Sequence, residues 1–306
     1  MSSVWYQVEH ETRYTHEGRV STSRHLCCLT PRSLPLQAVH LHTLSVDPYP
    51  TDLTTRDDVF GNRVSQFSIL TPYSQLRVIS RSLVEVWPRW PSSGLIDPSV
   101  SPAWETVRDG GVFHPGRAYD EAAEFRGPSP YIELTSDLAT FAFTSFTPGR
   151  PLLAAAIDLM HRIHDEFRFD TGATSITTPV SRVLAERGGV CQDFAHLQIA
   201  CLRSLGLPAR YVSGYLLTDP PPGQPRLVGA DASHAWLAVW CPHYGWVDLD
   251  PTNAVLPDQR HVTTAWGRDY GDVSPLRGIV LGGSAHELFV GVSVAPIASP
   301  QPAHDA

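Results

Sequence analysis

The side chain best suited to covalent chemistry stands at the start of a predicted helix. In RGGVCQDFAHLQIACLRSLGLPARYVSGY (187–215), a Gly-Gly pair precedes Cys191, and an apolar pattern of helical period follows it as far as Gly206. The first turn of a helix has unpaired N–H groups and the positive end of the helix dipole, which favour a thiolate over a thiol. We interpret Cys191 as a nucleophile; the alternative is that it only packs. Cys201, in the middle of the same helix, is expected in the core.

The residues around Cys191 allow two interpretations. The glycines before it are expected to let the backbone approach a substrate and to leave amides free for an oxyanion. Gln192 and Asp193 follow directly. They either contact substrate and support the thiol, or place charge and polarity at the positive end of the helix dipole. His196 lies about 140° around the helix from Cys191 and is expected to pack away from it.

A thiol nucleophile needs a general base and a group that orients the base. His234 opens the predicted strand SHAWLAVWC, 43 residues after Cys191, and Asp250 closes GWVDLDPT, 16 residues after His234. The segment CPHYG predicts a short hairpin between the two strands. If Trp236 lies opposite Asp250, then His234 and Asp250 share a face as diagonal neighbours. A slip of one residue would put them on opposite faces.

Asp248 is the competing carboxylate. It shares the face of Asp250 but would lie opposite Ala238, farther from His234. Each residue alone also has an ordinary explanation, because a histidine at a strand start is often a surface residue and Asp before Pro often forms a turn. The combination in the order Cys, His, Asp fits nucleophile, base and orienter.

The surrounding sequence predicts an α+β protein with two main parts. Residues 1–90 alternate in polarity and predict an antiparallel β-sandwich-like domain. Residues 91–149, rich in Pro and Gly, form a connecting segment expected to pack on both halves. Residues 150–297 hold helices followed by antiparallel strands, as in an α+β catalytic core, with further strands near the end. Residues 298–306 are expected to be disordered.

Composition narrows the function further. The 306 residues carry a net charge of −8, with 42% hydrophobic and 18% charged residues, which is typical of a soluble protein without a nucleic-acid face. No apolar run is long enough to cross a bilayer, and the N-terminus lacks the pattern of a secretory signal. We therefore expect a cytoplasmic protein that does not span a membrane.

The cysteines and histidines of the sequence, and its lack of lysine, argue against disulfides, a metal site and an acyl acceptor within the chain. Five cysteines, with Cys27 and Cys28 adjacent, do not form a disulfide framework, and no Cys-x-x-Cys zinc pattern occurs. His161 and His164 lie one helical turn apart, but no third ligand is evident, so we expect neither metal nor cofactor. The chain contains no lysine, so it offers no side-chain amine of its own as an acyl acceptor.

Three long segments resemble the bacterial transglutaminase-like proteins: GVCQDFAHLQIACLRSLGLPARYVSGYL, DASHAWLAVWCPHYGWVDLDPTNA and HVTTAWGRDYGDVSPLRG. The N-terminal YQVEHETRYTH, LTPR and DVFGNRV resemble the β-rich domain that accompanies this core, so the resemblance spans residues 4–297. It implies a papain-like cysteine-catalytic fold, with the family's catalytic triad on Cys191, His234 and Asp250.

The family includes peptidases, cross-linking enzymes, deglycosylating enzymes and members without catalysis. We expect hydrolysis of peptide or amide substrates through an acyl-enzyme, because water is the default acceptor and no calcium-binding pattern is present. Transfer of a protein glutamine to an amine is the alternative, and a non-catalytic peptide-binding module is the second alternative. Gln192, Asp193 and Trp236 are predicted to support the site or contact substrate. The segment 267–275 is expected either to line the cleft or to form an ordered surface loop.

Overall fold

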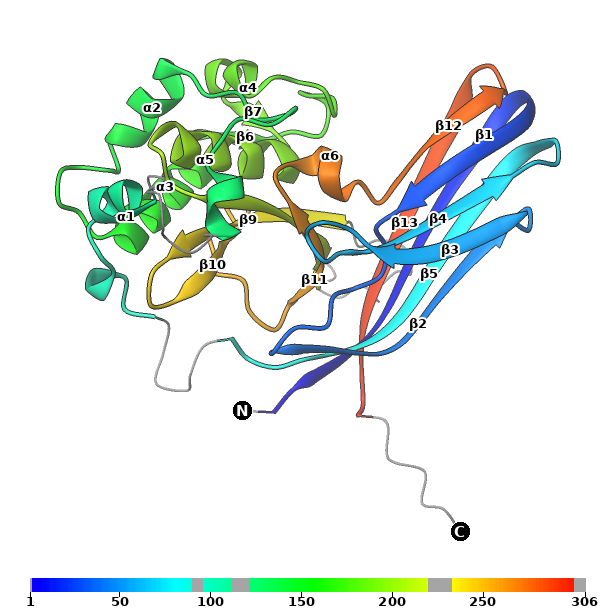
Figure 1. Cartoon of the computed structure of the whole chain (residues 1–306), viewed down its shortest axis with the longest axis horizontal. Helices are drawn as coiled ribbons and strands as arrows, with labels where there is room; N and C mark the ends of the chain where they lie inside the picture. The colour runs from blue at the N-terminus through cyan, green and yellow to red at the C-terminus, as the bar shows by residue number, and fades with distance from the viewer. Residues whose placement is uncertain (1, 90–95, 112–120, 220–232, 300–306) are drawn as a thin grey trace, which may run out of the picture.

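The protein has two lobes in the computed structural model, which describes residues 2–89, 96–111, 121–219 and 233–299. One lobe is a long, bent antiparallel sheet, and the other is a group of helices packed on a smaller sheet (Figure 1). This is the α+β architecture that the sequence predicts, with its β-rich part at the N-terminus. The described residues contain no helix that is long and apolar enough to cross a membrane.

The β-rich lobe is organised around one very long strand, β1. The first part of β1 pairs with β5 and β13, and its last part pairs with β4 and β12, with an irregularity in the register between Thr15 and Val20. β1 therefore belongs to two half-sheets, and apolar residues of β1, β4 and β5 pack in one cluster inside this sandwich-like lobe. The strands are β1 (Val4–Cys27), β2 (Gln37–Asp47), β3 (Asp52–Asp57), β4 (Arg63–Ile69), β5 (Tyr73–Val86), β12 (Leu276–Gly282) and β13 (His286–Ile297).

The chain returns to this lobe at its C-terminal end. The alternating pattern of residues 276–297 predicts strands, and β12 and β13 are present there. Both pair antiparallel with β1 and neither joins the smaller sheet. Alternation identifies a strand because side chains point to opposite faces, but it does not identify the partner strand. The β-rich lobe is thus built from both ends of the chain.

The second lobe packs its helices on one face of the smaller sheet. This sheet has the strand order β10-β9-β8-β11, and α5 packs on β9. The strands are β8 (Ala209–Leu216), β9 (Ser233–Cys241), β10 (Gly245–Leu249) and β11 (His261–Gly267). The helices are α1 (Trp104–Gly110), α2 (Ser136–Phe143), α3 (Leu152–Glu166), α4 (Val180–Glu186), α5 (Cys191–Ser204) and α6 (Tyr270–Val273), with 3-10 turns η1 (Pro98–Val100) and η2 (Glu121–Phe125) and the short pair β6 (Arg168–Phe169) and β7 (Gly188–Gly189).

One large core joins these helices to the sheet. α3 buries an almost continuous apolar face that begins at Leu152, and α5 is buried over most of its length. The same core includes Trp104, Ile132 and Leu138 from the segment predicted to connect the lobes. α5 also buries polar side chains, and those of Gln198 and Arg203 donate to the backbone carbonyls of Ala156 and Ala209, which allows the helix to lie in the interior.

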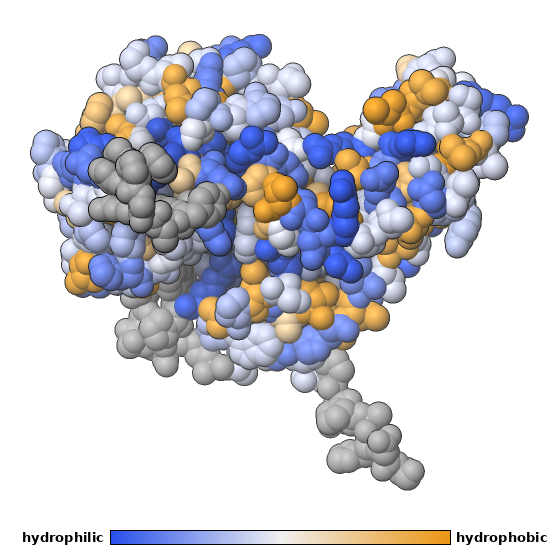
Figure 2. Space-filling model, in the orientation of Figure 1, coloured by the Kyte–Doolittle hydropathy of each residue, from blue (hydrophilic) through white to orange (hydrophobic). Residues whose placement is uncertain are grey.

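The two lobes meet through apolar side chains. Tyr6 and Val84 of the β-rich lobe pack in one cluster with Tyr215 of β8 and Val262 of β11. α6 lies where the two lobes meet (Figure 1). Elsewhere the surface is mixed, and Figure 2 shows apolar side chains at the far end of the β-rich lobe, over the end of β12, where Ile279 and Leu281 are exposed.

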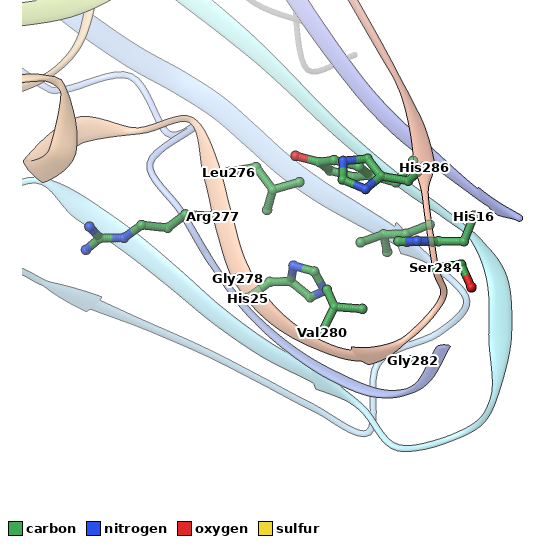
Figure 3. A pocket seen from close by; sticks show the side chains of 11 residues that line it. His16, His25, Leu276, Arg277, Gly278, Val280, Gly282, Ser284 and His286 are labelled. Carbon is green, nitrogen blue, oxygen red and sulfur yellow. The ribbon is translucent and has the colours of Figure 1, made fainter. Parts of the chain in front are cut away.

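The β-rich lobe contains a cavity of about 340 Å³ near the turn between β12 and β13. Figure 3 shows the imidazoles of His16, His25 and His286 around it, together with Ser284. Burial lowers the pKa of His25 to about 4, so this imidazole is neutral at neutral pH.

Candidate active site

Cys191 is the first residue of α5, as the sequence predicts. Its helix start is fixed by Asp193, whose carboxylate accepts from the Val190 N–H at 2.8 Å and from the Thr174 hydroxyl at 2.6 Å. Burial raises the pKa of Asp193, although these two hydrogen bonds act in the opposite direction. Cys191 itself is partly exposed, whereas Cys201 is fully buried, and burial raises the Cys201 pKa to about 12.

The glycines before Cys191 have a different role from the one predicted. Gly188 and Gly189 form the buried strand β7, which pairs with β6. A Cβ at Gly189 would lie 2.7 Å from a carboxylate oxygen of Asp193, closer than real Cβ contacts allow. The glycine at this position therefore makes room for the side chain that fixes the helix start, and the expectation of a glycine backbone facing substrate is corrected.

The predicted register of the hairpin β9–β10 is confirmed. Asp248 lies opposite Ala238 and Leu249 opposite Leu237, so that Asp250, just after β10, continues opposite Trp236. His234, at the start of β9, then reaches Asp250 diagonally. Its Nε2–H donates to Asp250 Oδ2 at 2.7 Å.

Asp250 is fully buried and accepts hydrogen bonds at both carboxylate oxygens. Besides His234, His261 Nε2 lies 3.1 Å from Oδ2 and Asn253 Nδ2 donates to the same atom at 2.7 Å. The backbone N–H groups of Thr252 and Asn253 donate to Oδ1 at 3.0 and 3.3 Å. Burial alone would raise the pKa of Asp250, but the hydrogen bonds from the two imidazoles hold it below its ordinary value. The carboxylate therefore stays ionised inside the protein.

His234 connects Asp250 to the thiol. Burial by itself would lower the pKa of His234, but its hydrogen bonds with Asp250 and with Cys191 raise the pKa to about 10. Asp250 engages Nε2, so Nδ1 is the ring nitrogen that remains for the thiol. The structure thus brings together the three side chains that the sequence singled out, in the order thiol, imidazole, carboxylate.

The other predicted residues lie around Cys191, His234 and Asp250. Gln192 donates from its side chain to the Ile176 carbonyl at 3.2 Å, in the loop before α4. Trp236 is fully buried, and its ring lies against His234 and His261, with centroids 6.0 and 5.2 Å apart. Trp236 therefore packs against both imidazoles from the protein interior.

His196 packs away from the thiol, as the helical angle predicts. It accepts a hydrogen bond from the Tyr270 N–H at 3.2 Å and stacks on Tyr131. Burial lowers its pKa to about 3, and the charge of Arg203 acts in the same direction. The segment 267–275 thus contacts α5 through Tyr270 and forms α6 at the start of the link to β12.

The competing carboxylate, Asp248, points along the same sheet face but has another partner. It forms a partly buried ion pair with Arg89, and Arg89 also donates to Thr263 at 3.1 Å. Asp248 therefore does not contact His234 in this structure.

The sequence interpretation missed two residues that contact Asp250. His261 starts β11, and Asn253 follows Asp250 by three residues in DPTN. The Asn253 N–H bond to the Asp250 side chain is a local turn that the DPTN pattern itself indicates. His261 had no such signal, because β11 lies at the opposite edge of the sheet from β10.

Within the described residues, one group places three metal-ligand atoms within 4.8 Å of one another, and it is His234, Asp250 and His261. The two imidazole–carboxylate hydrogen bonds account for this proximity. The histidines of the cavity in Figure 3 do not form such a group among the residues described.

Comparison with known proteins shows which family this chain resembles. Residues 6–85 match the bacterial transglutaminase-like N-terminal region, and residues 142–251 match the transglutaminase-like superfamily. An uncharacterized protein of Mycobacterium tuberculosis is 44% identical over 296 residues, which are 95% of this chain and 92% of that protein. An uncharacterized protein of Mycobacterium leprae is 32% identical over 299 residues, 95% of this chain and 99% of that protein.

A solved structure has the same fold. The crystal structure of a candidate cysteine protease from Cytophaga hutchinsonii covers 99% of this chain and 93% of its own, with a TM-score of 0.75 at 19% sequence identity. A more local match is the protein-glutamine gamma-glutamyltransferase of Pseudomonas aeruginosa, 35% identical over 96 residues, which are 31% of this chain and 12% of that protein. The superfamily match indicates an enzyme. The chain belongs to the transglutaminase-like superfamily, with the bacterial transglutaminase-like N-terminal region in front of its core.

Proposed function

We propose that the protein is a cysteine peptidase or amidase that uses Cys191, His234 and Asp250. The observation that carries the proposal is the buried, ionised Asp250 hydrogen-bonded to an imidazole that in turn contacts a partly exposed thiol. A carboxylate in this position orients the imidazole and stabilises its protonated form. The reactive form of cysteine is the thiolate, which forms when the thiol passes its proton to this imidazole.

The reaction follows from these positions. The Cys191 proton passes to His234 Nδ1, and the Sγ lone pair attacks the carbonyl carbon of an amide. The oxygen of the tetrahedral intermediate becomes negative and is stabilised by N–H groups at the start of α5, including that of Cys191, which the helix leaves unpaired. When the C–N bond breaks, His234 returns the proton to the leaving amine, and an acyl-enzyme thioester remains.

Water completes the cycle. It gives a proton to His234, attacks the thioester carbon, and releases a carboxylic acid and the Cys191 thiol. The proposed substrate is a peptide or another protein, because the thiol is partly exposed and not enclosed in the core.

Protein-glutamine amine transfer is the second candidate. It is favoured by the local match to the Pseudomonas aeruginosa protein-glutamine gamma-glutamyltransferase. The first half of the reaction would be the same on a glutamine side chain, with release of ammonia, and a primary amine would replace water in the second half. The chain has no lysine, so the amine would come from another molecule.

Mass spectrometry of a mixture of glutamine-containing peptides distinguishes the two reactions. The peptides are incubated with the protein and a primary amine, and the Cys191→Ala variant is the control. Peptide fragments, or glutamine converted to glutamate, support hydrolysis. Amine adducts on glutamine support transfer. Equal products with the variant and the wild type overturn both, because neither reaction proceeds without the thiol.

A further inference from the structure

A second cavity lies at the junction of the two lobes, on the sheet face that carries Trp236. It has a volume of about 490 Å³, within the range of sites for small ligands. The loop between β1 and β2 and the strands β8, β10 and β11 line it. Its apolar lining comes from Leu34, Leu36, Val212, Tyr244, Trp246 and Trp266.

The Arg210 end of this cavity lies away from the candidate active site, whereas Asp248 and Thr263 line its other side. Arg210, which lines it, lies opposite Ala238 in the sheet, whereas Gly214 at the other end of β8 lies opposite His234. Four residues of strand separate these positions, or about 13 Å. The fully buried Trp236 stands between them on the same face.

Arg210 is held in the cavity wall by stacking. Its guanidinium carbon lies 3.7 Å from the ring centre of Trp266 and 4.4 Å from that of Trp246. Arg32 of the β-rich lobe stacks on Trp266 as well, at 3.5 Å. Face-on contacts of this kind stabilise a cation, but they leave the N–H groups on the edge of the guanidinium without an acceptor.

The edge of Arg210 has no acceptor within the described part of the chain. The side chain is 9% exposed, its Nε has no hydrogen-bond partner, and none of the carboxylates described there forms an ion pair with it. Burial, followed by the charges of Arg32 and Arg89, lowers the pKa of Arg210. A buried donor without a partner costs free energy, and a buried charge without a partner costs more.

One positive charge on the cavity wall has no ion-pair partner among the described residues. Arg89 and Asp248 line the cavity and neutralise each other in their ion pair. Arg210 contributes one further positive charge that nothing described balances. The remaining wall is aromatic and aliphatic, so the complementary molecule carries a single anionic group on a flat apolar body.

We propose that this cavity binds a small aromatic monocarboxylate, with the carboxylate on the edge of Arg210 and the apolar body between Leu36 and the Trp246 and Trp266 rings. A carboxylate matches the forked donors of a guanidinium, and the indole rings that hold Arg210 also offer apolar surface to the ligand. The proposal does not depend on the reaction of Cys191.

Calorimetric titration with phenylacetate tests this inference, with 2-phenylethanol as a neutral molecule of similar size. The protein is first alkylated at Cys191 with iodoacetamide, so that binding at the thiol does not contribute. We expect phenylacetate to bind one site with a dissociation constant below about 1 mM, and 2-phenylethanol to bind at least about tenfold more weakly. Equal affinity of the two compounds, or no binding of phenylacetate, overturns the proposal.

Two variants locate the site. Arg210→Met keeps an apolar chain between the indole rings and is expected to remove the preference for the acid. Leu36→Trp adds bulk at a residue that is 40% exposed on the cavity rim and is expected to block both compounds without disturbing the fold. If Arg210→Met does not fold, the Leu36→Trp result still decides, because unchanged phenylacetate binding in that variant places the ligand elsewhere and overturns the proposal.

Discussion

Asp248 and Asp250 differ sharply, although they stand two residues apart on one sheet face. Asp250 is fully buried and accepts from His234 and His261, whereas Asp248 pairs with Arg89 at the junction of the lobes. One strand step of two residues therefore separates the carboxylate that the proposed mechanism uses from a carboxylate paired with an arginine of the other lobe. The identity of the residue is the same, and the partners determine the role.

The two ends of this sheet face also differ in how their cationic side chains, His234 and Arg210, are paired. At the His234 end, all the charged groups have partners and the thiol is close by. At the Arg210 end, one cation lines a cavity and has no partner in the described part of the chain. A charge used in catalysis has to be stabilised before the substrate binds. A charge in a binding site can instead receive its partner of opposite sign from the ligand.

The largest effect is expected from the thiol at the start of α5. Cys191→Ala should remove activity by a factor of about 10³ or more, because no other group replaces the nucleophile. Cys201→Ala is the matched control on the same helix and should keep activity while lowering the free energy of unfolding by about 1 kcal/mol. Initial rates and urea unfolding measure the two effects, and full activity in Cys191→Ala contradicts the mechanism.

Asp250→Asn should reduce the rate by about a hundredfold or more. This loss should be smaller than that in His234→Ala, because an orienting group is partly dispensable. The same variant should change the pH profile. Activity that depends on protonated His234 falls as pH rises through its pKa, which Asp250 helps to raise to about 10. Without the carboxylate the pKa of His234 falls, so the alkaline limb should move to lower pH. The pH dependence of kcat/KM measures this limb, and an unmoved limb means that another group sets it.

The variant His261→Gln tests what the second imidazole contributes to the rate. His261 contacts Asp250 and not the thiol, so it is a positioning residue whose loss should lower kcat by about tenfold with little change in KM. The alkaline limb should stay close to that of the wild type, because Asp250 still pairs with His234. A variant that loses only stability, with the kcat of the wild type, would show that His261 merely packs.

Asp248→Asn should have the smallest effect on activity. The substitution leaves Arg89 without its carboxylate partner, so the free energy of unfolding should fall by about 2 kcal/mol. The rate should stay close to that of the wild type, since Asp248 does not contact His234. Rates measured below the unfolding transition separate the two effects. A rate loss as large as that of Asp250→Asn means that the roles of the two carboxylates are not divided as we propose.

Local patterns predicted much of the site. Helical period and the glycines placed Cys191 at a helix start, and the short hairpin gave the register that puts His234 beside Asp250. The same local reasoning assigned the wrong role to Gly189, because the side chain it accommodates is visible only when α5 and its preceding turn are built in space. Catalytic roles, substrate and cytoplasmic location stay predictions.

The sequence by itself determined most of the elements, their order and the pairing of His234 with Asp250 across one short hairpin, because these depend on periods of two and 3.6 residues and on neighbours close along the chain. Tertiary structure alone decided that Cys191 meets His234, that His261 reaches Asp250, that β12 and β13 join β1, and that Arg210 has no acceptor among the described residues. These contacts join residues from different helices and strands or from the two ends of the chain. No local pattern encodes them, since alternation sets which face a side chain takes but not which strand lies beside it.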